Sequence, residues 1–389
     1  MERRGFDVTV IDVYGTVDAV EREGFGFRIV DRGFGRYDVL AVPVHCGVDP
    51  GPVEGTLRVD HHDLAGALAS GYKDGVAFEV TGVRGKTTVA TYLARILEEA
   101  GWPVKLSTTD TCPVGSPSVA PYKVLEVMRA TSGPYVIEVS LGVTPAADVA
   151  VLSGVPYDYR VAGGTRSAVA VKARKIAESG ALPVLERGDV SRLPPLPGAV
   201  LVETGEGRVS WRGGSVEFEP FGVPFHDRSF GLAAVAALES GLAGVEDVLA
   251  ARSRGFVPGR LELVGEDVLV DVHPAVNERT LRHALDVASR LWGRYGLVFG
   301  GDPGGYCEGI DVDEAVEEIL RRIESYELVG LELVGGLGEL VEDRLPVRPS
   351  PAPDGYPVVV VLRSDRDGEV FKRVVRRVRG GSEDGGGSA

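Results

Sequence analysis

The residues with the clearest chemistry stand together at positions 81–88, which read Thr-Gly-Val-Arg-Gly-Lys-Thr-Thr. Glycines let the backbone curl until the amides between residues 82 and 88 point at one anion, and a helix that begins there adds the positive end of its dipole. Lys86 would reach the outer phosphates of a nucleotide, and the Thr87 hydroxyl would ligate magnesium. The candidates for nucleotide binding are Thr81, Gly82, Val83, Arg84, Gly85, Lys86, Thr87 and Thr88. The general phosphate-loop pattern places its first glycine five positions before the second, where this chain has Val80, so the loop is a shortened variant, Gly-x-x-Gly-Lys-Thr-Thr.

The elements on either side of this loop determine whether it can hold a phosphate. Apolar residues predict a strand over residues 76–80, and the pattern after the loop predicts a helix over residues 88–100. That helix would carry Leu93, Ile96 and Leu97 on one face. A strand, a glycine loop and a helix in this order favour ATP binding over an ordinary glycine-rich turn.

Over most of the chain, short apolar runs alternate with helical segments, which predicts a doubly wound α/β fold built on parallel sheets. The other expected strands are residues 6–12, 27–30, 38–44, 135–139, 149–152, 183–185, 268–271, 296–299 and 358–362. The other expected helices are residues 63–69, 168–178 and 232–242. Breaks in the pattern predict a short α/β domain at 1–73, a central nucleotide-binding domain at 74–255, a third α/β domain at 256–379 and a flexible tail at 380–389.

Composition excludes several classes of partner. A net charge of −15 and a pI near 5.0 repel nucleic acid and anionic membranes, so neither is an expected partner. The apolar runs are too short to span a bilayer, and no signal peptide is recognisable at the amino terminus. Cys46, Cys112 and Cys307 stand far apart, which argues against a disulfide framework or a thiolate metal site and predicts a cytoplasmic protein.

The shortened loop resembles that of the Mur ligase family, which includes the peptidoglycan-precursor ligases and folylpolyglutamate synthetase. Further segments resemble this family in the same order along about 195 residues: 136–140, 150–159, 168–176, 226–227, 257–262 and 271–274. The resemblance implies a three-domain architecture, with a phosphate-loop central domain and Rossmann-like N- and C-terminal domains. It also implies ATP and magnesium as cofactors, and the transfer of the γ-phosphoryl group to a carboxylate to give an acyl phosphate.

The resemblance also assigns roles to residues outside the loop. Lys86, Glu138, Lys172 and Arg260 would be catalytic; Glu138 and a carbamylated Lys172 would hold magnesium together with Thr87, and Arg260 would follow the γ-phosphate. Nucleotide contacts would come from His226, Asp227 and Asp271.

Each of these assignments has a simpler structural alternative. Glu138 could merely cap a strand end, and Lys172 could be a solvated lysine on a polar helix face. Arg260 could form a salt bridge in a linker. His226 could be a structural histidine, and Asp271 an exposed loop carboxylate.

Three positions depart from the family pattern. Tyr159 stands where the family usually has a histidine that helps to hold a second magnesium, so a second metal site is in doubt. Asp227 and Phe230 replace asparagines that usually touch the nucleotide.

The short first domain resembles that of a methanogen branch of the family whose substrate is a nickel tetrapyrrole. The matching segments are residues 10–16, 41–46 and 59–62, supported by 83–86 and 273–277. The resemblance implies that a propionate is activated and that a carbon of the same macrocycle then closes a ring. His45, His61 and His62 are the candidate substrate-binding residues. Because adjacent residues of an extended segment point to opposite faces, His61 and His62 would chelate a metal poorly, although an axial contact from one histidine to the nickel stays open.

Two other functions remain open. One is an amide ligase of the same family, such as a pseudomurein peptide ligase, which would join an amino acid to the activated carboxylate. The other is a nucleotide-binding regulator without catalysis, which Tyr159 keeps in play. The oligomeric state cannot be predicted from the sequence.

Overall fold

The computed structural model describes residues 9–11, 28–30, 35–46, 52–273, 276–303 and 310–363. The chain separates into two compact units, residues 1–254 and 255–389, which are described one at a time. The proposed three-domain boundaries remain a prediction. Most of the segment 10–16, Cys307, and the expected tail 380–389 lie outside the described residues.

Two small parallel pairs of strands precede the large sheet of the first unit. Strand β1 (Thr9–Ile11) pairs with β2 (Arg28–Val30), and β3 (Gly35–Val42) pairs with β4 (Val53–Asp60). Helix α2 (His61–Ala69) follows β4 directly. Its cap is Asp60, whose side chain accepts hydrogen bonds from the amides of His62 and Asp63. The sequence-based prediction that His61 and His62 lie on an extended segment is therefore wrong, because this cap starts the helix at His61.

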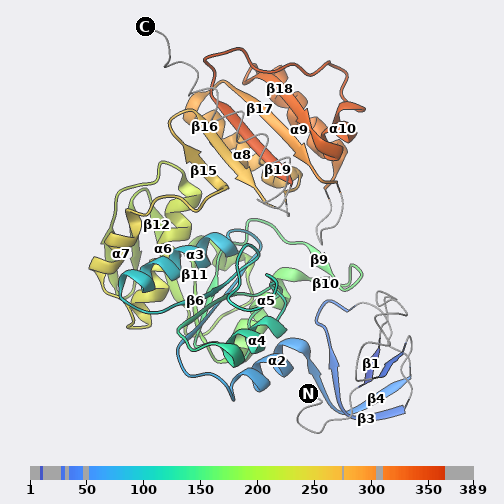
Figure 1. Ribbon diagram of the computed structural model, residues 1–389, viewed down its shortest axis with the longest axis vertical. Coiled ribbons are helices and arrows are strands. Elements are labelled where there is room, and N and C mark those ends of the chain that lie inside the picture. The colour runs from blue at the N-terminus through green and yellow to red at the C-terminus, as the bar shows by residue number, and fades with distance from the viewer. Residues whose placement is uncertain are drawn as a thin grey trace. The chain divides into compact units, whose positions relative to one another are not determined.

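An eight-stranded sheet forms the centre of the first unit, in the order β14-β13-β12-β11-β8-β5-β7-β6 (Figure 1). Strands β6 to β12 of this order run parallel, and β13 and β14 extend the edge antiparallel. The bounds are β5 (Ala77–Thr81), β6 (Lys105–Ser107), β7 (Tyr135–Glu138), β8 (Val149–Leu152), β11 (Leu182–Glu186), β12 (Val200–Gly205), β13 (Arg208–Trp211) and β14 (Gly214–Glu217). Every residue of β5, β7 and β8 is buried, as expected for central parallel strands.

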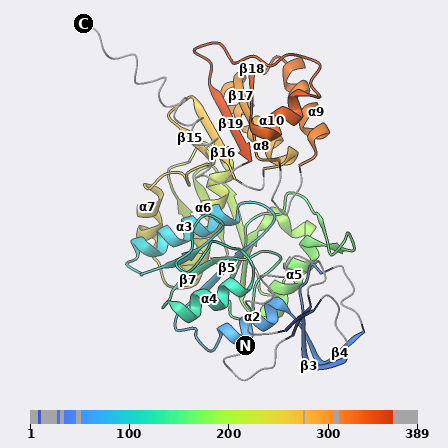
Figure 2. The ribbon, with the colours of Figure 1, turned by 45° about the vertical axis from the view of Figure 1, so that its right-hand side comes forward.

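Helices cover both faces of this sheet. Figures 1 and 2 show α3 (Lys86–Glu99) and α6 (Pro224–Glu239) on one face, and α2, α4 (Tyr122–Ala130) and α5 (Ala168–Ser179) on the other. The predicted apolar face of α3 is confirmed, because Leu93, Ile96 and Leu97 are all fully buried. The smaller elements of the unit are β9 (Arg160–Val161), β10 (Arg166–Ser167), the 3-10 helix η2 (Arg187–Arg192) and α7 (Val245–Arg252).

The second unit is a five-stranded sheet in the order β15-β16-β19-β17-β18. All pairs are parallel except β15 with β16. The strands are β15 (Arg260–Val264), β16 (Val268–Val272), β17 (Tyr295–Gly301), β18 (Leu328–Val334) and β19 (Val358–Arg363), and the helices are α8 (Glu278–Trp292), α9 (Val312–Glu324) and α10 (Gly335–Glu342). The α/β fold class predicted from the sequence is confirmed. Within the described residues, no helix has the length and apolar character needed to cross a membrane.

Candidate functional site

The loop between β5 and α3 has the geometry of a phosphate-binding turn. Gly82 has a φ of 149°, and a Cβ at this position would lie 2.3 Å from Oγ of Ser153. Gly85 has a φ of 81° and occupies the N-cap position of α3. Both positions therefore require glycine, one for a close approach and one for a left-handed backbone.

The amides of this loop fall into two groups. The amides of Val83 and Arg84 donate to the carbonyl of Gly154 over 2.9 and 3.4 Å, and Ser153 Oγ donates to the carbonyl of Arg84 over 2.6 Å. These bonds fix the loop to the end of β8. Helix α3 begins at Lys86, and the amides of its first turn have no acceptor in a preceding turn of the helix. The anion-binding amides are therefore best placed at the start of α3 rather than along the whole segment 82–88.

Glu138, at the end of β7, meets the phosphate loop. Its carboxylate is 2% exposed, and its Oε2 accepts a hydrogen bond of 2.8 Å from the Thr87 hydroxyl. Lys86 Nζ lies 3.9 Å from Oε1 of the same carboxylate. Three residues predicted from two separate motifs are thus adjacent, because the carboxyl ends of the neighbouring strands β5 and β7 meet at one edge of the sheet.

Thr109 belongs to the same cluster and was not predicted from the sequence. Its amide donates to Glu138 Oε2 over 3.3 Å, and its hydroxyl lies 3.1 Å from the Thr87 hydroxyl. Thr109 follows β6, which pairs with β7 on the other side. A polar residue just after a parallel strand was the available signal, since ligands bind where such strands end.

The donors of this cluster suit a hard divalent cation. Two hydroxyls and one carboxylate offer only oxygen, and magnesium is commonly held by one or two carboxylates with phosphates and water. Among the described residues, no three His, Cys, Asp or Glu side chains are grouped to hold a metal. A cation here would therefore depend on Thr87, Thr109 and Glu138 together with the phosphates of a nucleotide.

Lys172 is buried in α5, with 1% of its surface exposed. Its Nζ donates to the Tyr159 hydroxyl over 3.2 Å and lies 5.5 Å from the centre of that ring. The alternative of a solvated lysine on a polar helix face is therefore wrong. Tyr159, the residue that departs from the family pattern, lies in contact with the lysine that the pattern makes a metal ligand.

Gly142 brings α5 close to the phosphate loop. Its φ is 132°, and a Cβ there would lie 2.5 Å from Cβ of Lys175 and 3.8 Å from Cα of Lys172. The amide of Gly142 donates to the Thr81 hydroxyl over 3.2 Å. A residue larger than glycine would thus push α5, and Lys172 with it, away from the end of β5.

An ion cluster around the buried Lys175 joins α5 to the start of α2. Lys175 is 1% exposed, and its Nζ lies 2.9 Å from Asp60, 2.6 Å from Asp63 and 2.9 Å from Glu178. Asp60 uses Oδ2 for this contact and Oδ1 for the cap of α2. One carboxylate therefore connects the helix that carries Lys172 to the helix that carries the candidate substrate histidines.

The three histidines lie side by side. The ring centres of His61 and His62 are 4.4 Å apart, and those of His45 and His61 are 5.6 Å apart. His62 is fully buried and its Nε2 lies 2.9 Å from the carbonyl of Ser140, two residues after Glu138. Burial lowers the pKa of His62 to about 4 and that of His61 to about 3, so both rings are neutral near pH 7.

His226 and Asp227 open α6, which packs against α3. His226 is fully buried, with its Nδ1 2.6 Å from the Tyr92 hydroxyl of α3, so its ring links the two helices. Asp227 is also buried and accepts a hydrogen bond from the amide of Phe221 over 3.1 Å. Their contacts to a nucleotide remain predictions.

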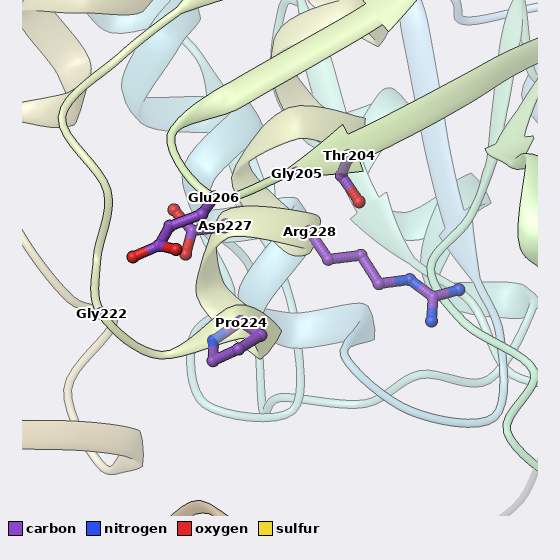
Figure 3. A pocket seen from close by; sticks show the side chains of 7 residues that line it. All are labelled: Thr204, Gly205, Glu206, Gly222, Pro224, Asp227 and Arg228. Atoms are coloured by element: carbon purple, nitrogen blue, oxygen red, sulfur yellow. The ribbon is translucent and has the colours of Figure 1, made fainter. Parts of the chain in front are cut away.

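A cavity of about 370 Å³ lies at the start of α6. Figure 3 shows its lining residues, with Arg228 and Thr204 on one side of the first turn and Glu206 and Asp227 on the other. Arg228 also forms an ion pair with the buried Asp189. The cavity is next to the phosphate loop, because a Cβ on Gly154, which anchors that loop, would lie 3.8 Å from the Arg228 guanidinium.

Arg260 and Asp271 lie together in the second unit. They face each other in register across β15 and β16. Asp271 is 3% exposed, its Oδ1 accepts a bond of 3.3 Å from the amide of Leu261, and its Oδ2 lies 3.6 Å from His273 Nε2. The alternative of an exposed loop carboxylate is therefore wrong for Asp271. Part of the matching segment, residue 274, lies outside the described residues.

Comparisons with known proteins show what the chain as a whole is similar to. No protein-family model matches the chain. The chain is 24% identical over 367 residues to a coenzyme F(430) synthetase of Methanocaldococcus jannaschii, which covers 84% of this chain and 85% of that protein. It is 27% identical over 230 residues to the protein of the same name from Methanosarcina acetivorans, which covers 50% of this chain and 48% of that one.

Solved structures share the fold. A bifunctional folylpolyglutamate synthase/dihydrofolate synthase with Mn, AMPPNP and L-glutamate bound has a TM-score of 0.57 at 14% identity, over 81% of this chain and 93% of that chain. The UDP-N-acetylmuramoylalanyl-D-glutamyl-2,6-diaminopimelate–D-alanyl-D-alanyl ligase from Acinetobacter baumannii has a TM-score of 0.50 at 16% identity, over 82% and 78%. The chain is thus similar in sequence to two coenzyme F(430) synthetases and has the fold of these folylpolyglutamate and peptidoglycan-precursor ligases.

Proposed function

We propose that the chain uses ATP and magnesium to activate a propionate of a nickel-containing tetrapyrrole and closes a ring on the same macrocycle. The substrate would be 15,17(3)-seco-F(430)-17(3)-acid and the products coenzyme F(430), ADP and phosphate. The observation that carries this proposal is the cluster of Lys86, Thr87, Thr109 and Glu138 at the start of α3. The name shared by the curated relatives supports the choice of substrate.

The chemistry has two steps. A carboxylate oxygen attacks the γ-phosphorus of ATP, the bond to the β-phosphate oxygen breaks, and ADP leaves. A carbon nucleophile of the macrocycle, having lost a proton, then attacks the acyl carbonyl and phosphate leaves. Charge gathers on the phosphoryl oxygens in the first step, so stabilisation by positive groups dominates.

The residues at the start of α3 would position this charge. The ammonium of Lys86 and the helix amides would face the phosphates. A bound magnesium ion would supply further positive charge, held by Thr87, Thr109 and Glu138. Arg260 would follow the γ-phosphate, a role suited to a guanidinium. Asp271 would hold the ribose.

Lys172 is proposed to act as a carbamate. CO2 would add to its neutral amine, one proton would leave, and the resulting oxygens would join the ligands of magnesium. Burial supports this role, because it favours a neutral amine over a charged one. Tyr159 would then hold the carbamate through its hydroxyl, in a site with one magnesium ion.

The substrate assignment is tested by phosphate release from the purified chain with ATP, magnesium and the tetrapyrrole acid, without an amino acid. The expected result is one phosphate and one cyclised product per ATP. Phosphate release that requires an added amino acid would reject the tetrapyrrole assignment. It would instead support an amide ligase such as a pseudomurein peptide ligase, which the solved neighbours with amino-acid or peptide substrates in their names favour.

A nucleotide-binding regulator is the remaining alternative, favoured by Tyr159 in place of the metal-ligating histidine. It predicts tight ATP binding with no turnover of either class of carboxylate. Calorimetric titration with a nonhydrolysable nucleotide, beside the phosphate assay, separates it from both ligase functions.

A further inference from the structure

In the neutral imidazole of His61, one ring nitrogen carries the N–H hydrogen, and the contacts show which one it is. The backbone amide of Val44 donates to Nδ1 of His61 over 3.3 Å, so Nδ1 holds a lone pair. A neutral imidazole whose Nδ1 accepts carries its hydrogen on Nε2. Nε2 of His61 is therefore a donor, and the described residues provide no acceptor for it.

The neighbouring His62 holds the start of α2 in place. Its Nε2 donates to the Ser140 carbonyl over 2.9 Å, and the whole ring is buried. His61, next to it, is only partly buried. Asp60 caps the helix on which both residues stand and is itself held by Lys175. The His61 donor is thus part of a ring that is held in place on α2 and is partly exposed.

The residues that pack around Val44 place the His61 donor on the side of the site where Lys172 lies. Val44, which fixes the His61 ring, packs in an apolar cluster with Leu141 and Val171, and Tyr159 lies against that cluster. Val171 precedes Lys172, and Tyr159 contacts it. His61 belongs to α2 rather than to α3, where the reacting carboxylate must meet the phosphate. A group bound by His61 is therefore a different part of the substrate.

We propose that His61 is a specificity residue that donates a hydrogen bond from Nε2 to a carboxylate of the macrocycle other than the one that is activated. This inference rests on the proposed function. A carboxylate is the acceptor that a neutral donor near the surface binds most strongly, because charged hydrogen bonds are about twice as strong as neutral ones.

The same tautomer argues against nickel ligation by His61. A metal needs a lone pair on the ligating nitrogen, and Nε2 carries the hydrogen while Nδ1 accepts from Val44. His62 uses its Nε2 for the Ser140 carbonyl, and its Nδ1, which has no hydrogen-bond partner among the described residues, is buried with the rest of the ring. The axial contact to nickel left open by the sequence is thus disfavoured for both histidines of the pair.

Two variants of His61 test the roles of its two ring nitrogens one at a time. In His61→Asn the amide oxygen takes the place of Nδ1 and keeps the acceptor for Val44, but nothing reaches the position of Nε2. In His61→Gln the amide nitrogen reaches that position and restores the donor. The expected result is a KM for the tetrapyrrole acid raised about tenfold in His61→Asn and largely restored in His61→Gln. The KM for ATP, kcat and the melting temperature should stay near those of the wild type.

A substrate series tests the same bond without any variant. Methyl esters at the non-reacting carboxylates should raise the KM of the wild type by a similar factor and that of His61→Asn little further. An unchanged KM for the esters, or for His61→Asn, in a chain that turns over the acid would overturn the inference alone. No turnover of the acid by the wild type would overturn the proposed function instead. A nickel absorption spectrum that changes on binding to the wild type but not to His61→Asn would show axial ligation and overturn the donor assignment.

Discussion

The hydroxyl of Thr87 donates to Oε2 of Glu138 over 2.8 Å, although the two residues are 51 positions apart. This bond joins the helix end that would face the phosphates to the carboxylate that would hold the metal. Glu138→Gln keeps the shape of the side chain and removes its charge. The rate of ATP-dependent phosphate release should fall about a hundredfold or more, because one anionic metal ligand is lost. A steady-state phosphate assay over a range of magnesium concentrations measures this.

Glu203→Gln is the matched control, since Glu203 is 57% exposed and, within the part of the chain that the structure describes, forms an ion pair with Arg187 alone. Its rate should equal that of the wild type. Near-normal turnover by Glu138→Gln at low magnesium would remove Glu138 from the metal site.

Thr109 offers a test of a residue that no motif pointed to. Thr109→Val removes the hydroxyl beside Thr87 but keeps the amide that donates to Glu138. We expect the magnesium concentration for half-maximal activity to rise about tenfold, by analogy with the effect of disturbing groups around a metal. Thr109→Ser keeps the hydroxyl and should restore the wild-type value. If valine and serine behave alike, the hydroxyl does not assist the metal.

The carbamate on Lys172 has a direct spectroscopic signature. Incubation with ¹³C-labelled bicarbonate should give a carbamate carbon resonance in the NMR spectrum of the wild type. Lys172→Met should lack that resonance and have lost phosphate release. Lys123→Met is an informative control, because Lys123 is equally buried but pairs with Glu126 and is held charged. A wild-type spectrum identical to that of Lys172→Met would contradict the carbamate.

Gly142 and Gly180 form a matched pair for the placement of α5. Both have positive φ, so alanine should strain each backbone by about 1 kcal/mol. A Cβ at Gly142 would collide with Lys175, whereas nothing described lies within 4 Å of a Cβ at Gly180. Gly142→Ala should therefore lower kcat about tenfold or more while ATP still binds, because misplaced catalytic groups cost activity steeply. Gly180→Ala should keep its kcat, and an equal loss in both variants would argue against the close approach.

The buried Glu79 makes stability depend on pH. Its carboxyl oxygens bond to the amide and hydroxyl of Thr144 over 2.7 and 2.5 Å, and burial raises the pKa of Glu79 from 4.5 to about 7. The folded chain therefore holds the proton more tightly than the unfolded chain. This contribution is fully present below pH 4.5 and is lost as the pH rises to about 7, with a total on the order of 3 kcal/mol.

Glu79→Gln should remove this dependence, because its amide can donate to the Thr144 hydroxyl and accept from the Thr144 amide at every pH. The melting temperature measured from about pH 5 to about pH 8 should fall less in this variant than in the wild type. The same decline in both proteins would show that Glu79 does not titrate in this window.

Much of the fold could be predicted because the central strands are continuous apolar runs. Residues 149–152 were predicted as a strand and form β8, and the helix predicted at 168–178 is α5 within one residue. The strand β12 was missed although it begins with an apolar run at residues 200–202, and β13 and β14 were missed since polar residues alternate with apolar ones along them. Strand β4 was missed for the same reason, with Glu54 and Arg58 exposed along it.

The site was predictable where chemistry demands a rare combination of residues. A glycine loop followed by lysine and threonine has few other uses, so Lys86 and Thr87 could be identified. Thr109 could not, because a threonine in a loop is common and only the sheet order brings it to Glu138. The helix at His61 was predictable in hindsight from Asp60, a favoured cap followed three residues later by Asp63. The burial of Lys172 depends on the approach at Gly142, a tertiary contact that no local pattern records.

Asp60 divides its two oxygens between the amides that begin α2 and the ammonium of Lys175. Asp60 is also the last residue of β4, so a junction placed after residue 60 would separate the cap from its helix. Chimeras between this chain and its relatives should therefore carry residues 60–69 and α5 together as one segment.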